Sequence, residues 1–216
     1  MIEIQSLNED IFLSSDENII YKSFWSKSKN KVFVPQNINF KYLILGSDSE
    51  NDISFDIEWE NVRGEIYAIF FGDKSVSSHI KVNILSSNSQ INVYTISFIH
   101  TDNQFDINCL IKLWKDISNS QWHLLEKNIV LSNKLKIKAI PRLDVYSNDV
   151  KASHWLSIDR VNEETMFYLN SKWLDELISK EMIIKGHIQQ ILSQFEDISK
   201  SKNKELEKTI LSAMTK

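Results

Sequence analysis

The alternation of apolar and polar residues between Lys31 and Val145 constrains the fold of this chain more than any other feature. Several short runs place an apolar side chain at every second position, and clusters of Ser, Asn and Asp separate the runs. A period of two puts one set of side chains on a buried face and the other in water, as in a β-strand. The clearest runs are Ile53, Phe55, Ile57 and Trp59; Ile80, Val82 and Ile84; Phe105, Ile107, Cys109, Ile111 and Leu113; and Leu135 and Ile137.

Many short strands without intervening helices predict a mainly β body. A sandwich, a barrel and a β-helix all fit this pattern, because periodicity does not distinguish them. We expect residues 31–160 to form the β core. The preceding residues 1–30 have scattered apolar positions among Ser, Asn and Lys, so we expect a loosely structured lead-in with at most one short helix.

The period changes after Asn162, which predicts a C-terminal helical subdomain over residues 161–216. Glu163 and Glu164 suit the positive end of a helix dipole, and Asp175 suits a second N-cap. A linker is expected at residues 197–204. A helical stripe follows Asp175, and a last amphipathic helix is expected at the end of the chain. The stripe contains Leu177, Ile178, Ile184, Ile188, Ile191, Leu192 and Phe195, and the last helix contains Leu206, Ile210, Leu211 and Met214.

Composition narrows the class of protein. With 216 residues and 42% hydrophobic residues, the chain has the material for one globular domain or for one domain with an appendage. A net charge of -4 gives no basic field for nucleic acid. The single cysteine, Cys109, excludes an internal disulfide and fits a reducing compartment. No secretory signal and no membrane-length apolar run is present, so we expect a cytoplasmic protein.

The segment from Pro141 to Leu169, PRLDVYSNDVKASHWLSIDRVNEETMFYL, resembles the C-terminal core of the SufB/SufD family of iron–sulfur cluster assembly scaffolds. The family pattern there reads roughly P-x-L-x-I-x-x-D-D-V-x-C-S-H, followed after a spacer by L-F-Y-L-x-S-R-G. The residues in register with it are Pro141, Leu143, Val145, Asn148, Asp149, Val150, Ser153, His154, Phe167, Tyr168, Leu169 and Ser171.

This resemblance implies a right-handed parallel β-helix with a C-terminal α-helical segment. The stretch NKVFVPQNINFKYLIL is similar to the strand, Val-Pro, turn and strand with which that β-helix begins. It also implies a non-enzymatic, SufD-like subunit that pairs with a SufB-type scaffold, or with itself as a homodimer, and binds a SufC-type ATPase. The partner-binding residues implied by the family are Met166, Phe167, Tyr168, Leu169, Leu177, Ile184 and Ile188.

His154 is the candidate metal ligand, because a SufD histidine at the matching position lies at the SufB–SufD contact and is implicated in cluster building. A neutral imidazole is a suitable ligand for iron. The alternative is a histidine on a turn, hydrogen-bonded to the backbone. Asp144 or Asp149 is a candidate to orient the imidazole.

The departures from the family pattern favour the SufD role. Ala152 stands where the family often has cysteine, and Trp155 and Leu156 replace small residues. Without a thiolate at Ala152, the chain lacks the natural iron–sulfur ligand there. We therefore expect no cofactor bound by the chain itself, and an iron–sulfur cluster only on the assembled complex.

Two further observations leave alternatives open. Cys109 is in phase with the apolar face, as a small hydrophobe would be, although a thiol is also a potential sulfur acceptor. His79, His100 and His123 are spaced so that they would stack as a metal-binding column in a coiled β fold, or by chance.

No glycine-rich phosphate loop or nucleophile motif is present, so an enzyme is not expected. The alternative function is a degenerate β-solenoid module for protein interaction, without a role in cluster assembly.

Overall fold

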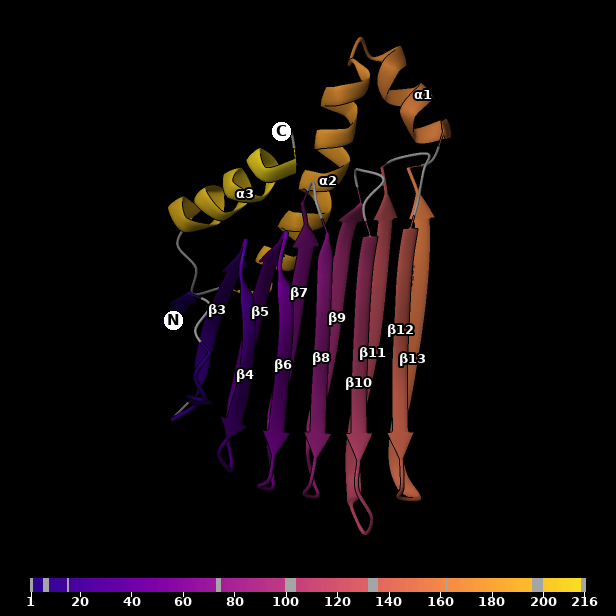
Figure 1. Ribbon diagram of the computed structural model, residues 1–216. Coiled ribbons are helices and arrows are strands. Elements are labelled where there is room, and N and C mark those ends of the chain that lie inside the picture. The colour runs from indigo at the N-terminus through magenta and orange to yellow at the C-terminus, as the bar shows by residue number, and fades with distance from the viewer. Residues whose placement is uncertain are drawn as a thin grey trace.

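A computed structural model describes residues 2–5, 8–14, 16–72, 75–99, 104–131, 136–161, 163–195 and 200–214. The chain folds as a parallel β-solenoid, followed by three helices (Figure 1). Consecutive strands alternate between two sheets, and each strand pairs with the strand two places along the chain. Parallel pairing of this kind confirms the β-helix and excludes the sandwich that periodicity alone left open.

The odd-numbered strands form a seven-stranded sheet: β1 (Ile2–Gln5), β3 (Glu17–Phe24), β5 (Asn39–Ser47), β7 (Arg63–Phe71), β9 (Gln90–Ile99), β11 (Ser118–Val130) and β13 (Asp149–Arg160). The even-numbered strands form a six-stranded sheet: β2 (Ile11–Phe12), β4 (Lys27–Val34), β6 (Glu50–Ile57), β8 (Val76–Ile84), β10 (Gln104–Leu113) and β12 (Lys136–Val145). A coil is one even-numbered strand with the odd-numbered strand that follows it.

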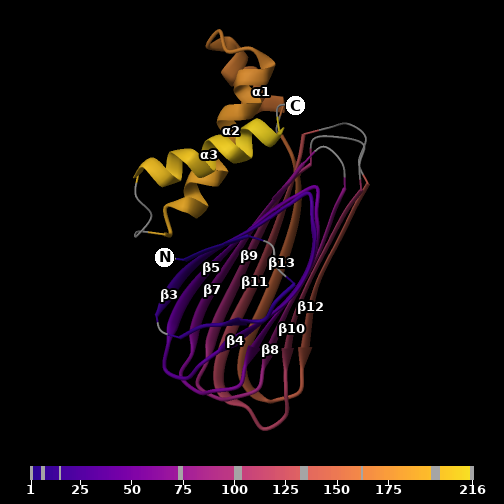
Figure 2. The same ribbon diagram turned by 60° about the vertical axis from the view of Figure 1, so that its left-hand side comes forward.

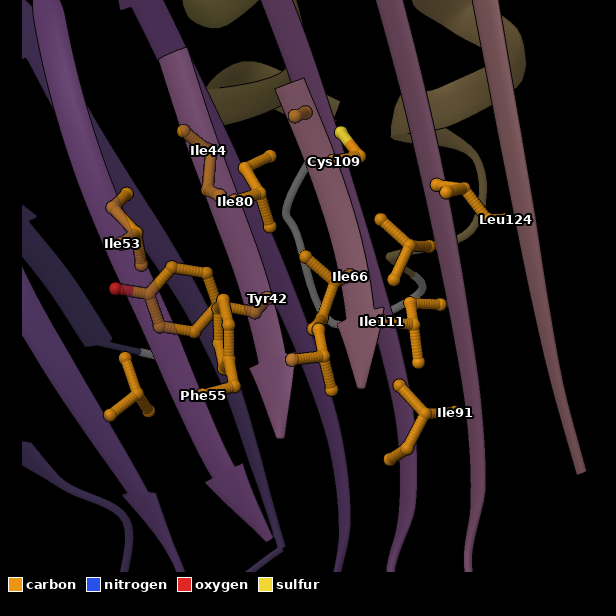
Figure 3. Packing of buried hydrophobic residues seen from close by; sticks show 14 of the residues in the cluster. Tyr42, Ile44, Ile53, Phe55, Ile66, Ile80, Ile91, Cys109, Ile111 and Leu124 are labelled. Carbon is orange, nitrogen blue, oxygen red and sulfur yellow. The ribbon is translucent and has the colours of Figure 1, made fainter. Parts of the chain in front are cut away.

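The core lies in the lumen between the two sheets, where every second side chain of each strand points inward (Figure 3). Phe55 and Ile57 of β6 and Ile66 of β7 are all 0% exposed. The polar residues between them point outward, and on the six-stranded sheet they form ion pairs such as Lys27 with Glu50 (2.6 Å). Exposed pairs of this kind contribute little to stability, so the buried apolar rows hold the coils together.

The expectation of a loosely structured lead-in is wrong. β1, β2, β3 and the first half of β4 lie within residues 1–30, and the described part of that segment contains no helix. The sequence pattern missed this early start of the solenoid because polar residues occupy inward positions in β4. Ser28 donates a hydrogen bond to Asn51 (2.9 Å), and Asn30 accepts one from the Tyr21 hydroxyl (2.7 Å). These pairings satisfy buried polar groups and hide the apolar alternation from the sequence.

Three helices follow the last strand: α1 (Glu163–Ser171), α2 (Glu176–Leu192) and α3 (Lys200–Met214). The change from strand to helix falls between Arg160 and Glu163, where the sequence predicted it. Asp175 is the N-cap of α2, and its carboxylate accepts a hydrogen bond from the Ile178 amide (2.8 Å). α3 begins at Lys200, inside the segment expected to be a linker.

α3 and the second half of α2 pack against the outer face of the seven-stranded sheet (Figure 2). Its outward residues there are apolar, so strands such as β7 are buried on both faces. β7 reads as a continuous apolar run from Ile66 to Phe71, which is typical of a strand covered on both sides. The second core joins sheet and helices through Leu43, Ile69, Phe71, Phe98, Ile184, Ile188, Leu192, Phe195, Leu206 and Ile210, among others.

Candidate functional site at the terminal coil

The last coil, β12 and β13, ends both sheets. β13 is the outermost strand of the seven-stranded sheet and β12 that of the six-stranded sheet, so among the described residues each has a strand on one side only. In Figure 1, α1 lies above the upper end of this edge, and no helix runs beside the two strands there. Val145 and Ile158, whose register partners Leu113 and Asn128 are buried, are 40% and 48% exposed. Lumen-facing side chains are thus open to solvent at this end.

His154 lies in the middle of β13, in register with Leu124 of β11. Leu124 is buried in the lumen, so the register places His154 on the lumen-facing side of the open edge, where it is exposed. The expected alternative, a histidine on a turn, is wrong, because the turn residues come before β13. Ala152 faces the same way, in register with Trp122, and provides no ligand.

The two aspartates proposed to orient His154 do not reach it. Asp144 lies on β12 of the other sheet and pairs with Arg142 (3.3 Å). Asp149 lies at the first position of β13, five residues from His154, or about 16 Å along a strand. The neighbour Ser153 instead shares a hydrogen bond with Nδ1 of His123 on β11.

The histidine column is not formed by the described residues. His79 lies on β8 of the six-stranded sheet, whereas His123 lies on β11 of the seven-stranded sheet. His100 lies outside the described residues. Across the described chain, no three His, Cys, Asp or Glu side chains come together so as to hold a metal ion. His154 is therefore not part of such a group within the described chain.

Cys109 points into the lumen and is 1% exposed (Figure 3). Burial, together with the carboxylate of Glu126, raises the pKa of its thiol well above the ordinary value. The thiol is therefore protonated at neutral pH and a poor nucleophile, which fits its interpretation as a small hydrophobe.

Glu126 was missed by the sequence reasoning. It is 1% exposed, and neither carboxylate oxygen has a hydrogen-bond partner among the described residues. Burial raises its pKa to about 7, and the nearby amide of Asn128 acts in the opposite direction. A signal was present in the sequence, because Glu126 is in phase with the apolar Trp122 and Leu124, four positions and two positions before it.

The helices carry the second candidate surface, and only part of the predicted set is available to a partner. Phe167, Tyr168 and Leu177 are 78%, 60% and 58% exposed. Met166 and Leu169 are half-buried. Ile184 and Ile188 are buried against the sheet, so assigning them to a partner is wrong for the chain as folded.

Three exposed apolar residues join this surface that the predicted set lacked: Trp173 (98%), Met182 (49%) and Ile178 (43%). Ile178 and Met182 are one helical turn apart on α2 and are exposed, whereas Ile184 and Ile188 of the same helix are buried. Within the described part of the chain, none of the helices combines the length and the apolar character that a membrane crossing requires.

A family model described as "SUF system FeS cluster assembly, SufBD core domain" matches residues 39–187, from the start of β5 into α2. This match covers more than half of the chain. The chain belongs to the SufBD family. It is similar to the iron-sulfur cluster assembly protein SufD of Escherichia coli (strain K12), with 24% identity over 90 residues. It is also similar to an iron-sulfur cluster assembly SufBD family protein of Synechocystis sp., with 33% identity over 70 residues.

These matches are partial on both sides. The first covers 42% of this chain and 21% of the E. coli protein, and the second covers 32% and 16%. The matched region therefore spans about a fifth or less of each relative. The residues that match the family model run from the solenoid, through the terminal coil with His154, to the beginning of the helical region.

Proposed function

We propose that this chain is a non-enzymatic, SufD-like scaffold subunit in iron–sulfur cluster assembly. The observation that carries the proposal is the open terminal coil. β12 and β13 are 10 and 12 residues long and expose apolar side chains at an unpaired edge. Long unprotected edges pair with another chain unless something blocks them. The occupant is a SufB-type subunit, or a second copy of this chain, which would continue both sheets.

The junction formed in this way would bring His154 next to the partner's last coil. This chain contributes one imidazole there and no thiolate, since Ala152 occupies the cysteine position of the family pattern. The cluster is cargo in this account, and its thiolate ligands would come from the partner. Family membership supports this assignment.

The second partner is a SufC-type ATPase, which we assign to the exposed face of α1 and α2. This helical pair extends beyond the end of the solenoid (Figure 1). Large apolar side chains gather on it, and Trp173 is almost fully exposed. An exposed apolar patch on a projecting helix pair is typical of a protein-binding surface.

Co-purification of the tagged chain with a co-expressed SufB-type protein tests the edge. Ile158→Asp places a charge in the lumen-facing row of β13 and should reduce recovery of the partner at least tenfold. Trp59→Asp is the control, because Trp59 is also apolar and exposed (55%) but lies beyond the end of β6, away from β12 and β13. Equal recovery with both variants would contradict edge pairing.

Co-purification with a SufC-type ATPase tests the helical surface. The double variant Phe167→Asp with Tyr168→Asp should lose the ATPase and retain the SufB-type partner. Trp59→Asp is the control, since Trp59 is 55% exposed beyond the end of β6 and distant from α1. Retention of the ATPase by the double variant would contradict its assignment to the helical surface, but not the proposed pairing at the terminal coil.

The missing thiol at Ala152 favours one alternative, a SufBD-fold interaction protein without a role in cluster assembly. Iron and sulfide content separates the two functions. A complex that forms through the terminal coil and never carries iron would support the alternative.

A further inference from the structure

A hollow of about 500 Å³ lies between α2 and the outer face of the seven-stranded sheet. Its floor is one row of outward side chains that are in register on four neighbouring strands, Tyr67, Tyr94, Leu125 and Trp155. The opposite wall is formed by α2. A volume of this size is typical of sites for small molecules.

The floor of the hollow is an aromatic ladder with one gap. The rings of Tyr67 and Tyr94 are stacked, with centroids 5.1 Å apart and planes 18° from parallel. The next strand carries Leu125 in place of a ring, and the one after it carries Trp155, which is 62% exposed. Two strand spacings, about 9.6 Å, separate the backbones of Tyr94 and Trp155. A planar ring in contact with a ring on each side needs about 7–8 Å, so the gap above Leu125 admits one such ring.

The polar groups at the hollow offer no surplus positive charge. Lys127 lies 3.8 Å from the Asp159 carboxylate, and Glu65 pairs with Lys41 (3.3 Å). The Tyr67 hydroxyl donates a hydrogen bond to Glu65 (3.2 Å). Burial, with a smaller effect of Lys127, lowers the pKa of His187, which therefore lines the hollow as a neutral imidazole at pH 7. An anionic ligand would find no free cation among the groups that line this hollow.

We propose that the hollow binds a planar heteroaromatic ring, uncharged or singly cationic, which lies over Leu125 and completes the stack between Tyr94 and Trp155. Gln190 of α2 and Gln194, which follows the end of that helix, line the hollow and supply amide groups for hydrogen bonds to the edge of the ring. Trp155 stands where the family pattern has a small residue. It lies on β13, but its side chain points outward with Leu125, on the face opposite to the lumen-facing row of the proposed junction.

The experiment uses the purified chain and thioflavin T, a planar monocation whose fluorescence rises when it stacks in an ordered site. Wild type should bind it with saturation at one dye per chain. Leu125→Tyr fills the gap with a ring, and Trp155→Ala removes one wall of it, so each should weaken binding about tenfold or more. Trp59→Ala is the control, because Trp59 is similarly exposed but lies elsewhere, and it should bind like wild type.

Competition tests the planarity of the ligand. Indole and adenine, both uncharged and planar, should displace the dye from wild type, whereas cyclohexylamine, which is not planar, should not. Circular dichroism should show that Leu125→Tyr and Trp155→Ala fold like wild type. Unchanged dye affinity in both variants would overturn the assignment to this hollow. Displacement by cyclohexylamine as effective as by indole would overturn the planar class.

Discussion

The coil made by β6 and β7 and the coil made by β12 and β13 carry the same alternation but opposite exposure. In the inner coil, Phe55, Ile57 and Ile66 are fully buried. In the terminal coil, Val145 and Ile158 on lumen-facing positions are 40% and 48% exposed. The inner coil has a coil on each side, and the terminal coil has one on a single side. Burial in a solenoid therefore comes from stacking, and the exposed row marks the place where a further coil would stack.

The largest expected difference between the two coils is in stability. Phe55→Ala should lower the free energy of unfolding by about 3–5 kcal/mol, because it leaves a cavity between packed coils. Ile158→Ala should cost less than about 1 kcal/mol in the chain alone, since half of that side chain is already in water. Urea unfolding measures both. Equal losses would mean that the terminal coil is packed as tightly as the inner one.

Glu126, a buried polar residue in the coil next to the terminal coil, predicts that the stability of the chain depends on pH. Glu126 has a pKa of about 7 in the folded chain, against 4.5 as the ordinary value. The folded state thus holds this proton more tightly than the unfolded state does. The contribution of Glu126 to the free energy of unfolding is fully present below pH 4.5. It is lost as the pH rises through about 7, by about 3 kcal/mol in total.

Glu126→Gln removes that titration. The variant should be more stable than wild type at pH 8, by about 2–3 kcal/mol, and close to it at pH 4.5. Thermal or urea unfolding at the two pH values measures this. Glu60→Gln is the control, because Glu60 is exposed, and it should change neither value appreciably. A variant that is no more stable than wild type at pH 8 would show that the Glu126 carboxylate is solvated or paired in the folded chain.

The strands with apolar inward rows could be predicted from the sequence, and the first half of β4 could not. In β10, each inward position from Phe105 to Leu113 is apolar, and in β6 the inward positions after Asn51 are apolar. In β4, the inward Ser28 and Asn30 are polar and are satisfied by hydrogen bonds across coils that no single-sequence pattern reveals.

The apolar stripe of α2 was predicted correctly, but the surface against which Ile184 and Ile188 pack was predicted incorrectly. Periodicity shows that Ile184 and Ile188 need an apolar surface, but it does not say whose. The chain provides that surface itself, through outward residues such as Ile69 and Phe98. The continuous apolar run in β7 was the available signal that this sheet face is covered.

The smallest expected effect on stability belongs to His154. His154→Ala should change the melting temperature by no more than about 1 °C, because the side chain is exposed at the open edge. Under the proposed function, the iron content of the co-purified complex should fall while the partner is retained. If the variant complex contains as much iron as the wild-type complex, the His154 imidazole is not an iron ligand.

Hydrogen–deuterium exchange at the terminal strand tests most directly whether the open coil is an interface. In the free chain, the backbone groups of β13 have a neighbouring strand on one side only, whereas those of β8 have one on each side. Adding the SufB-type partner should slow exchange in residues 149–160 at least tenfold and leave residues 76–84 unchanged. A complex that forms without slower exchange in residues 149–160 would contradict the account.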